Sequence, residues 1–218
     1  MKKGNAIILA SGGLDSYVLA HLLKKEGKKI SLIFVNYNQK SLGAELRSVK
    51  NLALELGCEL EIIDLPWLGK ISTSFINNDE KRDSELLNWY VPCRNMLFLI
   101  LGLALAESKF IKENEENDVY IGIKYENIGF RDTTEKFLEK MNQLTEFTEK
   151  GKFEFKAPFI AMDKEDIIEL GKKLGLRMEN TFSCYVSDDK HCGNCSACKA
   201  RKKGFKFSRV EDNTEYES

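Results

Sequence analysis

The apolar positions in the first half of the chain alternate between short runs and longer periodic stretches. The short runs are typical of buried strands, and they occupy residues 7–9, 30–35 and 60–65. The longer stretches have apolar residues at helical spacing and predict helices over residues 14–25 and 42–56, the second ending at Gly57. Because strands that alternate with helices are usually parallel and joined by crossovers, the pattern predicts an α/β fold with a doubly wound parallel sheet.

The second half continues with helices and one further strand. A strongly apolar helix is predicted over residues 96–110, and a buried strand over residues 119–123. An amphipathic helix follows over residues 133–147, and a further helix is capped by Asp163 or a neighbour. These elements extend the same alternating pattern, and no internal repeat interrupts it.

Two polar segments depart from the pattern. Residues 69–90 predict either a solvated loop or a lid over an active site. Residues 210–218 are polar and predict a frayed, disordered end.

Composition limits the class of protein. The chain has 218 residues, a net charge of −1 and 31% charged residues, which suits one α/β domain with a small appendage and disfavours direct nucleic-acid binding. The longest apolar run, residues 96–106, is well short of the roughly 20 residues that span a bilayer. No apolar run near the start is long enough for a signal peptide. We therefore expect a cytoplasmic protein without a membrane segment.

The first candidate for chemistry is the stretch Ser11-Gly12-Gly13-Leu14-Asp15-Ser16, between the first strand and the first helix. Glycines without a Cβ let successive backbone N–H groups converge on an anion, and the helix N-terminus adds partial positive charge. A carboxylate beside a phosphate is repulsive unless it caps the helix or meets Mg²⁺. A simple Gly-Gly turn with Asp15 as a cap is the alternative. Six such residues in a row favour a phosphate site.

The second candidate is a cluster of cysteines. Four of the six cysteines are Cys184, Cys192, Cys195 and Cys198. Cys-x2-Cys links direct two sulfurs at one ion, so the spacing predicts a structural tetrahedral zinc site. An iron–sulfur cluster is the rival, but the sequence after the last cysteine lacks the Cys and Pro of ferredoxins. The basic residues that follow, Lys199, Arg201, Lys202 and Lys203, form either a solvated helix face or a nucleic-acid contact.

The stretch from Ser11 to Ser16 resembles the PP-loop of ATP pyrophosphatases, which split ATP into AMP and pyrophosphate. Together with the cysteines, it makes the chain similar over nearly its full length to the 7-cyano-7-deazaguanine synthase family of the queuosine pathway. Further matching positions are Tyr37, Gln39, Val91, Pro92, Arg94, Asn95, Glu107, Ala157, Pro158, Lys164, Ser183, Tyr185, Arg201 and Phe205.

The resemblance implies a fold and an activity. The fold is an adenine nucleotide alpha hydrolase-like (PP-loop, Rossmann-like) domain over residues 1–180, followed by a zinc module over 181–208 and a tail over 209–218. The activity is an ATP-dependent ligase that adenylates 7-carboxy-7-deazaguanine and releases pyrophosphate. Ammonia then gives the amide, and a second ATP leads to the nitrile. ATP, Mg²⁺ and Zn²⁺ are the implied cofactors, and a homodimer is the implied assembly.

The resemblance also implies roles for individual residues. ATP would be bound by Ala10, Ser11, Gly12, Gly13, Leu14, Asp15 and Ser16. Catalysis would involve Asp15, Ser16, Arg94 and Lys164. The substrate would contact Tyr37, Gln39, Arg94, Asn95, Glu126 and Asp132.

Several positions depart from the family's pattern and leave alternatives open. Cys93 stands where the family has Gly, and Thr133 and Thr134 stand where it has Cys and Arg. A divergent member could stop at the adenylate or amide, or pass the acyl group to an amine on a partner protein. A non-catalytic, zinc-stabilised nucleotide- or RNA-binding protein is a third reading. A tRNA-thiolation enzyme would need a cysteine pair, for which Cys58 and Cys93 lack the usual spacing.

Overall fold

The computed structural model describes residues 4–79, 85–124 and 129–217. Five parallel strands form one sheet in the order β3-β2-β1-β4-β5. The strands are β1 (Asn5–Leu9), β2 (Ile30–Asn36), β3 (Glu59–Asp64), β4 (Asn117–Ile121) and β5 (Phe155–Lys156). The order reverses between β1 and β4, and this is the place where α/β sheets bind ligands at the carboxyl ends of their strands.

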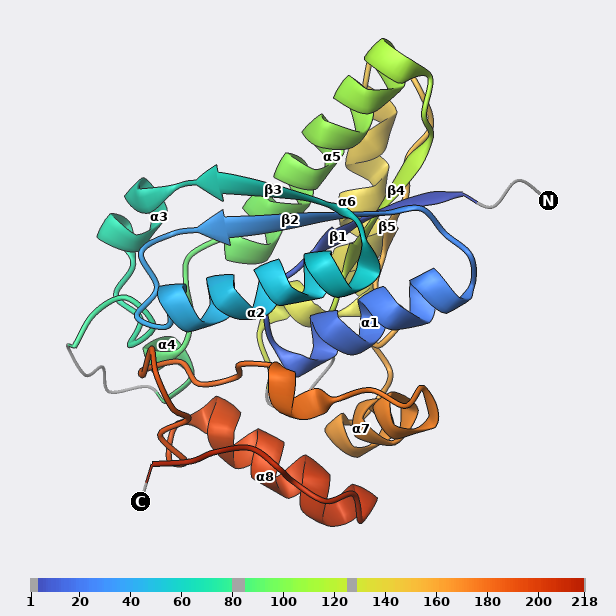
Figure 1. Cartoon of the computed structure of the whole chain (residues 1–218). Coiled ribbons are helices and arrows are strands. Elements are labelled where there is room, and N and C mark those ends of the chain that lie inside the picture. The colour runs from blue at the N-terminus through green and yellow to red at the C-terminus, as the bar shows by residue number, and fades with distance from the viewer. Residues whose placement is uncertain (1–3, 80–84, 125–128, 218) are drawn as a thin grey trace.

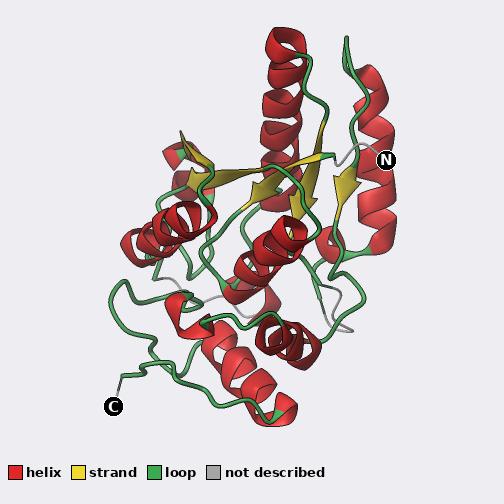
Figure 2. Cartoon of the chain, turned by 45° about the vertical axis from the view of Figure 1, so that its right-hand side comes forward, coloured by secondary structure: helices red, strands yellow, loops and turns green. Residues whose placement is uncertain are grey.

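Helices cover both faces of the sheet, as Figures 1 and 2 show. The helices are α1 (Leu14–Lys25), α2 (Leu42–Leu56), α3 (Pro66–Ile71), α4 (Glu85–Asn88), α5 (Arg94–Glu113), α6 (Glu135–Leu144), α7 (Lys164–Lys173) and α8 (Ser196–Ser208). Short 3-10 turns lie at Arg131–Thr133, Thr145–Phe147 and Met178–Asn180.

Alternate residues of the strands enter two separate cores. Ile8 belongs to the core on the side of α1, α2 and α7, whereas Ile7 belongs to the core under α5 and α6. This division follows from the two-residue period of a strand, which directs neighbouring side chains to opposite faces. The doubly wound parallel sheet that the apolar pattern predicts is confirmed. Among the described residues, no helix is long and apolar enough to cross a membrane.

β5 and the packing within residues 69–90 differ from the sequence-based expectations. β5 has only two residues, which pair with Val119 and Tyr120 and are too few to give a period. Within residues 69–90, Ser74 and Ile76 are buried, and the Ser74 hydroxyl donates to the Asn88 carbonyl at 3.0 Å. Part of this segment is therefore packed rather than solvated.

The C-terminal segment also differs from the expectation of a frayed tail. His191 and Tyr216 form a parallel bridge, and the Tyr216 hydroxyl donates to Asp212 at 2.7 Å. The segment runs back along α8 (Figure 1). The described part of the tail, up to residue 217, is thus attached to the cysteine-containing module.

For the basic residues after the cysteines, the sequence suggested a solvated helix face or a nucleic-acid contact. Arg201 does not belong to a solvated face. Only 1% of Arg201 is exposed. Its guanidinium donates to the hydroxyls of Thr181, Ser183 and Thr214 and to the Met178 carbonyl, at 2.7 to 2.9 Å. Arg201 therefore joins α8 to the turn before the cysteines and to the tail.

Replacing Arg201 by methionine should destabilise the protein by about 3 kcal/mol, because buried oxygens would lose a charged donor. Urea unfolding of the two proteins measures this difference. The exposed Lys199→Met, on the same helix, is the control and should change the free energy of unfolding by less than about 0.5 kcal/mol. Equal effects of the two substitutions would contradict the structural role given to Arg201.

Candidate functional site

A cavity of about 590 Å³ lies at the carboxyl ends of the central strands. Every described residue that the sequence analysis assigned to ATP, substrate or catalysis lines it, with the exception of Gly12. Glu126 lies outside the described residues. Residues far apart in the chain thus meet around one space. Glu45, Trp89, Tyr90 and Phe130 are among the further residues that line the cavity, although no motif marked them.

The loop after β1 is held from behind by α2. Gly12 has φ of 75°, and a β-carbon there would lie 2.6 Å from the Glu45 carbonyl oxygen. The Ser48 hydroxyl donates to the Gly12 carbonyl at 2.8 Å. Gly12 is therefore in the left-handed conformation, whereas Gly13 is extended, with φ of −77°. The loop is therefore fixed with its other residues facing the cavity.

Asp15 does not cap α1, so the simple-turn alternative does not describe this loop. The N-cap residue is Gly13, and it makes no side-chain cap bond. Both Asp15 carboxylate oxygens instead accept from the Lys164 ammonium at 2.7 Å. Lys164 is the first residue of α7, whose start is fixed by a capping box between Asp163 and Asp166. The ion pair lines the cavity beside the loop.

Arg94, at the start of α5, contacts the loop after β2. Its guanidinium donates to the Tyr37 hydroxyl at 3.3 Å and lies 6.0 Å from the centre of the Tyr37 ring. Burial raises the pKa of Tyr37, which keeps the phenol neutral. Arg94 therefore supplies a fixed positive charge to the cavity wall.

Gln39 uses most of its hydrogen-bonding groups within the protein and so helps to hold the cavity wall. Its side-chain nitrogen donates to the Val35 carbonyl at 3.3 Å and to a Glu45 carboxylate oxygen at 2.9 Å. Its side-chain oxygen accepts from the Tyr37 backbone N–H at 3.0 Å. Because both amide hydrogens are used within the protein, only the oxygen of Gln39 has capacity left for a ligand.

Asn95 and Asp132 connect the start of α5 to the turn before α6. The Asn95 amide donates to the Asp132 carbonyl at 3.2 Å, and burial raises the pKa of the Asp132 carboxyl. Of the two threonines that depart from the family's pattern, Thr133 lines the cavity. Thr134 instead caps α6 by accepting from the Phe137 N–H at 3.1 Å. Only Thr133 can affect a bound molecule directly.

Cys93 is exposed and has φ of 55° at the start of α5. This conformation favours glycine, which explains on backbone grounds why a glycine suits the position. Neither Cys93 nor Cys58 lines the cavity. The thiol of Cys93 is therefore not part of the cavity wall, and among the described residues no cysteine pair lines the cavity.

The four clustered cysteines form a metal-binding site. Their sulfurs lie within 4.8 Å of one another, and two of the separations, Cys192 to Cys198 and Cys184 to Cys195, are 4.0 Å. A tetrahedral ion with bonds of about 2.3 Å needs sulfurs about 3.8 Å apart, so the residues fit such an ion. These separations are too long for a disulfide.

The four thiols also influence one another's ionisation. Hydrogen bonds from Cys195 and Cys198 lower the pKa of Cys184, whereas the interaction with Cys184 raises the pKa of Cys195 and of Cys198. Four thiols this close cannot all lose their protons unless a positive ion compensates. The cysteines therefore have the chemistry of a ligand set.

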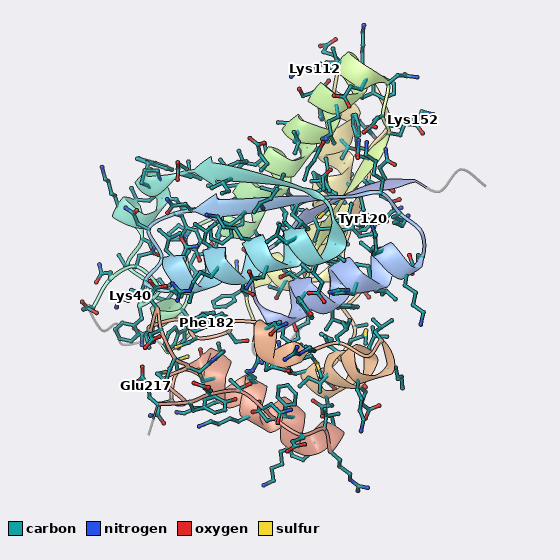
Figure 3. The ribbon with its side chains drawn as sticks, viewed as in Figure 1. Lys40, Lys112, Tyr120, Lys152, Phe182 and Glu217 are labelled. Atoms are coloured by element: carbon teal, nitrogen blue, oxygen red, sulfur yellow. The ribbon has the colours of Figure 1, made fainter. Side chains whose placement is uncertain are left out.

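The cysteine module forms one wall of the cavity. Ser196, Ala197 and Ala200 of α8 line it, as does Phe182. Phe182, labelled in Figure 3, lies between α8 and the loop after β1, and its backbone N–H donates to the Gly12 carbonyl at 2.9 Å. A β-carbon at Gly204 would lie 2.5 Å from Lys164 Cγ, so glycine allows α8 to approach α7 closely. The segment that carries the cysteines therefore packs directly against the phosphate loop and α7, and it contributes to the cavity wall.

The chain is similar to known proteins over nearly its full length. The 7-cyano-7-deazaguanine synthase of Nitratiruptor sp. is 36% identical over 222 residues, covering 98% of this chain and 99% of that protein. The 7-cyano-7-deazaguanine synthase of Methanosphaera stadtmanae is 35% identical over 230 residues, covering 99% of each. The crystal structure of a 4-thiouridine synthetase–RNA complex with bound ATP matches with a TM-score of 0.51 and 18% identity. The match covers 94% of this chain and 50% of that one. At this identity, the similarity supports the fold alone. The family model described as queuosine biosynthesis protein QueC matches residues 5–209, and the chain belongs to that family.

Proposed function

We propose that the protein is an ATP-dependent ligase that adenylates the carboxylate of 7-carboxy-7-deazaguanine and converts it, through the amide, into the nitrile. The observation that carries the proposal is the loop from Ser11 to Ser16 with its Asp15–Lys164 pair, facing one cavity in a member of this family. The names of its relatives supply the product, since each is called 7-cyano-7-deazaguanine synthase.

In the first step the substrate carboxylate attacks the α-phosphorus of ATP, and the bond to the pyrophosphate group breaks. The backbone N–H groups of the loop and the hydroxyls of Ser11 and Ser16 would hold the leaving pyrophosphate. Lys164 would offset the negative charge that develops on it. Asp15 would hold Mg²⁺, which supplies charge neutralisation at the phosphates when it is bound.

The substrate would occupy the opposite part of the cavity. Its planar heterocycle suits the aromatic wall formed by Trp89, Tyr90, Phe130 and Tyr185. Arg94 would attract the carboxylate before activation, and Asn95 and Asp132 would contact polar edges of the ring. Burial keeps the phenol of Tyr185 neutral by raising its pKa to about 12, so this residue would act as a hydrogen-bond donor.

The metal held by the cysteines is proposed to be zinc, because closed four-sulfur sites of this kind are typical of structural zinc. Its role would be to fix the cavity wall formed by α8, with no part in the chemistry. The homodimer implied by the family resemblance stays a prediction.

A second candidate function is supported by Thr133. This residue lines the cavity at a position where the resemblance implies cysteine. A change there could stop the reaction at the amide or direct the acyl group to an amine of another molecule. The retained Asp15–Lys164 pair argues against a purely non-catalytic binding protein.

Mass spectrometry of the products tests the proposal. The purified protein is incubated with Mg-ATP, ammonium and 7-carboxy-7-deazaguanine, and AMP and pyrophosphate are quantified together. A nitrile with two AMP per product molecule is the expected result. An amide that accumulates with one AMP would establish the second candidate instead, and no AMP would contradict both.

A further inference from the structure

Glu45 is a buried carboxylate in the cavity wall that the proposed mechanism has not used. It lies in the first turn of α2, is only 9% exposed, and lines the cavity. Burial raises the pKa of its carboxyl to about 7, although hydrogen bonds from Ser41 and Gln39 act in the opposite direction. Burying a carboxylate in this way is costly, and such groups are usually paired or functional.

The neighbours of Glu45 hold the carboxylate with neutral donors only. The Ser41 hydroxyl donates to one oxygen at 2.6 Å, and the Gln39 amide donates to the other at 2.9 Å. Within the described residues, no Lys, Arg or His forms a salt bridge with Glu45. Arg94 acts on it electrostatically but is bonded to Tyr37 instead. Each carboxylate oxygen has lone-pair capacity left beyond its one bond.

Glu45 lines the same cavity as Ser11, Asp15 and Ser16 of the phosphate loop. Its backbone packs closely against Gly12 of the phosphate loop. A β-carbon added to Gly12 would lie 2.6 Å from the Glu45 carbonyl oxygen. A fixed carboxylate that accepts hydrogen bonds from Ser41 and Gln39 but from no described cationic side chain is suited to a small cation that carries hydrogen-bond donors. Ammonium fits this description, and the proposed reaction consumes it.

We propose that Glu45 binds ammonium and takes a proton from it, delivering ammonia to the acyl-adenylate; this inference rests on the proposed function. One N–H bond of ammonium breaks and its proton goes to the Glu45 carboxylate. The nitrogen lone pair then forms the C–N bond to the acyl carbon, the C–O bond to the phosphate breaks, and AMP leaves with that electron pair. The extra proton on the new amide nitrogen passes to solvent.

The substitution Glu45→Gln separates this role from adenylation, which needs no nitrogen donor. Its side chain has the same shape and can still bond Ser41 and Gln39. We expect carboxylate-dependent exchange of pyrophosphate into ATP to be unchanged, and amide formation from ammonium to fall by about 100-fold or more. Hydroxylamine, which is uncharged at neutral pH and needs no deprotonation, should restore turnover and give the hydroxamate.

The control is Glu55→Gln, near the other end of the same helix and outside the cavity lining. It should leave both steps unchanged. If Glu45→Gln does not fold, Glu45→Asp provides the test, because it keeps the carboxylate and should lower amide formation more than exchange.

The remaining outcomes overturn the inference in different ways. Equal loss of exchange, amide and hydroxamate formation in Glu45→Gln would mean that the residue only supports the phosphate loop. Unchanged amide formation from ammonium would remove Glu45 from the reaction. If the unaltered protein itself shows no exchange, the proposed function fails first, and this result is distinguishable because it does not depend on the variant.

Discussion

Replacing Asp15 by alanine is expected to lower ATP-dependent adenylation by about 100-fold or more and to leave the fold intact. The carboxylate accepts two bonds from Lys164 at 2.7 Å and lies on the cavity wall. Its loss would remove the proposed Mg²⁺ ligand and release Lys164 from its position, so charge on the leaving pyrophosphate would be poorly balanced. Carboxylate-dependent pyrophosphate exchange measures the step directly.

The fold should tolerate this change because the pair is not deeply buried. The side chains of Lys164 and Asp15 are 18% and 22% exposed, so the lysine can be hydrated once its partner is gone. We expect the free energy of unfolding to fall by about 1 kcal/mol or less. Asp15→Asn, which keeps the shape and removes the charge, should be equally inactive. Adenylation at the normal rate in Asp15→Asn would refute a role for the charge.

Replacing Cys195 by serine should strongly lower the free energy of unfolding, in contrast to Asp15→Ala, which should mainly lower adenylation. Cys195 is buried and its sulfur lies 4.0 Å from that of Cys184. Serine is a poor ligand for a thiolate-binding metal, and in such sites metal binding contributes to the free energy of folding. We expect a destabilisation of about 4 kcal/mol or more, which is in the range seen when a structural metal is lost.

Metal analysis and thermal unfolding together test this prediction. Cys195→Ser should lose bound metal and melt at lower temperature, and a strong chelator should have the same effect on the unaltered protein. Cys93→Ser is the matched control, since Cys93 is exposed and outside the cluster. If Cys195→Ser and Asp15→Ala melted at the same temperature, the division between a structural and a chemical site would be wrong.

The sequence was informative where local patterns decide the structure. The helices Leu14–Lys25 and Leu42–Leu56 begin and end at the residues predicted, because apolar periodicity and a left-handed Gly57 determine them locally. The phosphate loop and the four cysteines were identified from short motifs, and the structure brings the cysteine sulfurs together.

The features that the sequence did not reveal depend on contacts between distant segments. Arg201 resembles its lysine neighbours in the chain, yet it is buried because Thr181 and Thr214 reach it from two other segments. Glu45 occupies an ordinary helix position, yet it is buried in the cavity wall, where the phosphate loop packs against its backbone. The nearby polar residues Gln39 and Ser41, which donate to its carboxylate, are the local signals that the sequence contains.

The ion pair between Asp15 and Lys164 joins residues that are 149 positions apart, and the Gly12 carbonyl is bonded by Phe182. During synthesis on a ribosome, the phosphate loop emerges long before its partners exist. The cavity wall beside the loop can therefore be completed only when most of the chain has been made, and a shorter nascent chain lacks the Asp15–Lys164 pair. The same long sequence separation favours slow folding, because distant segments must meet before their contacts give any stabilisation.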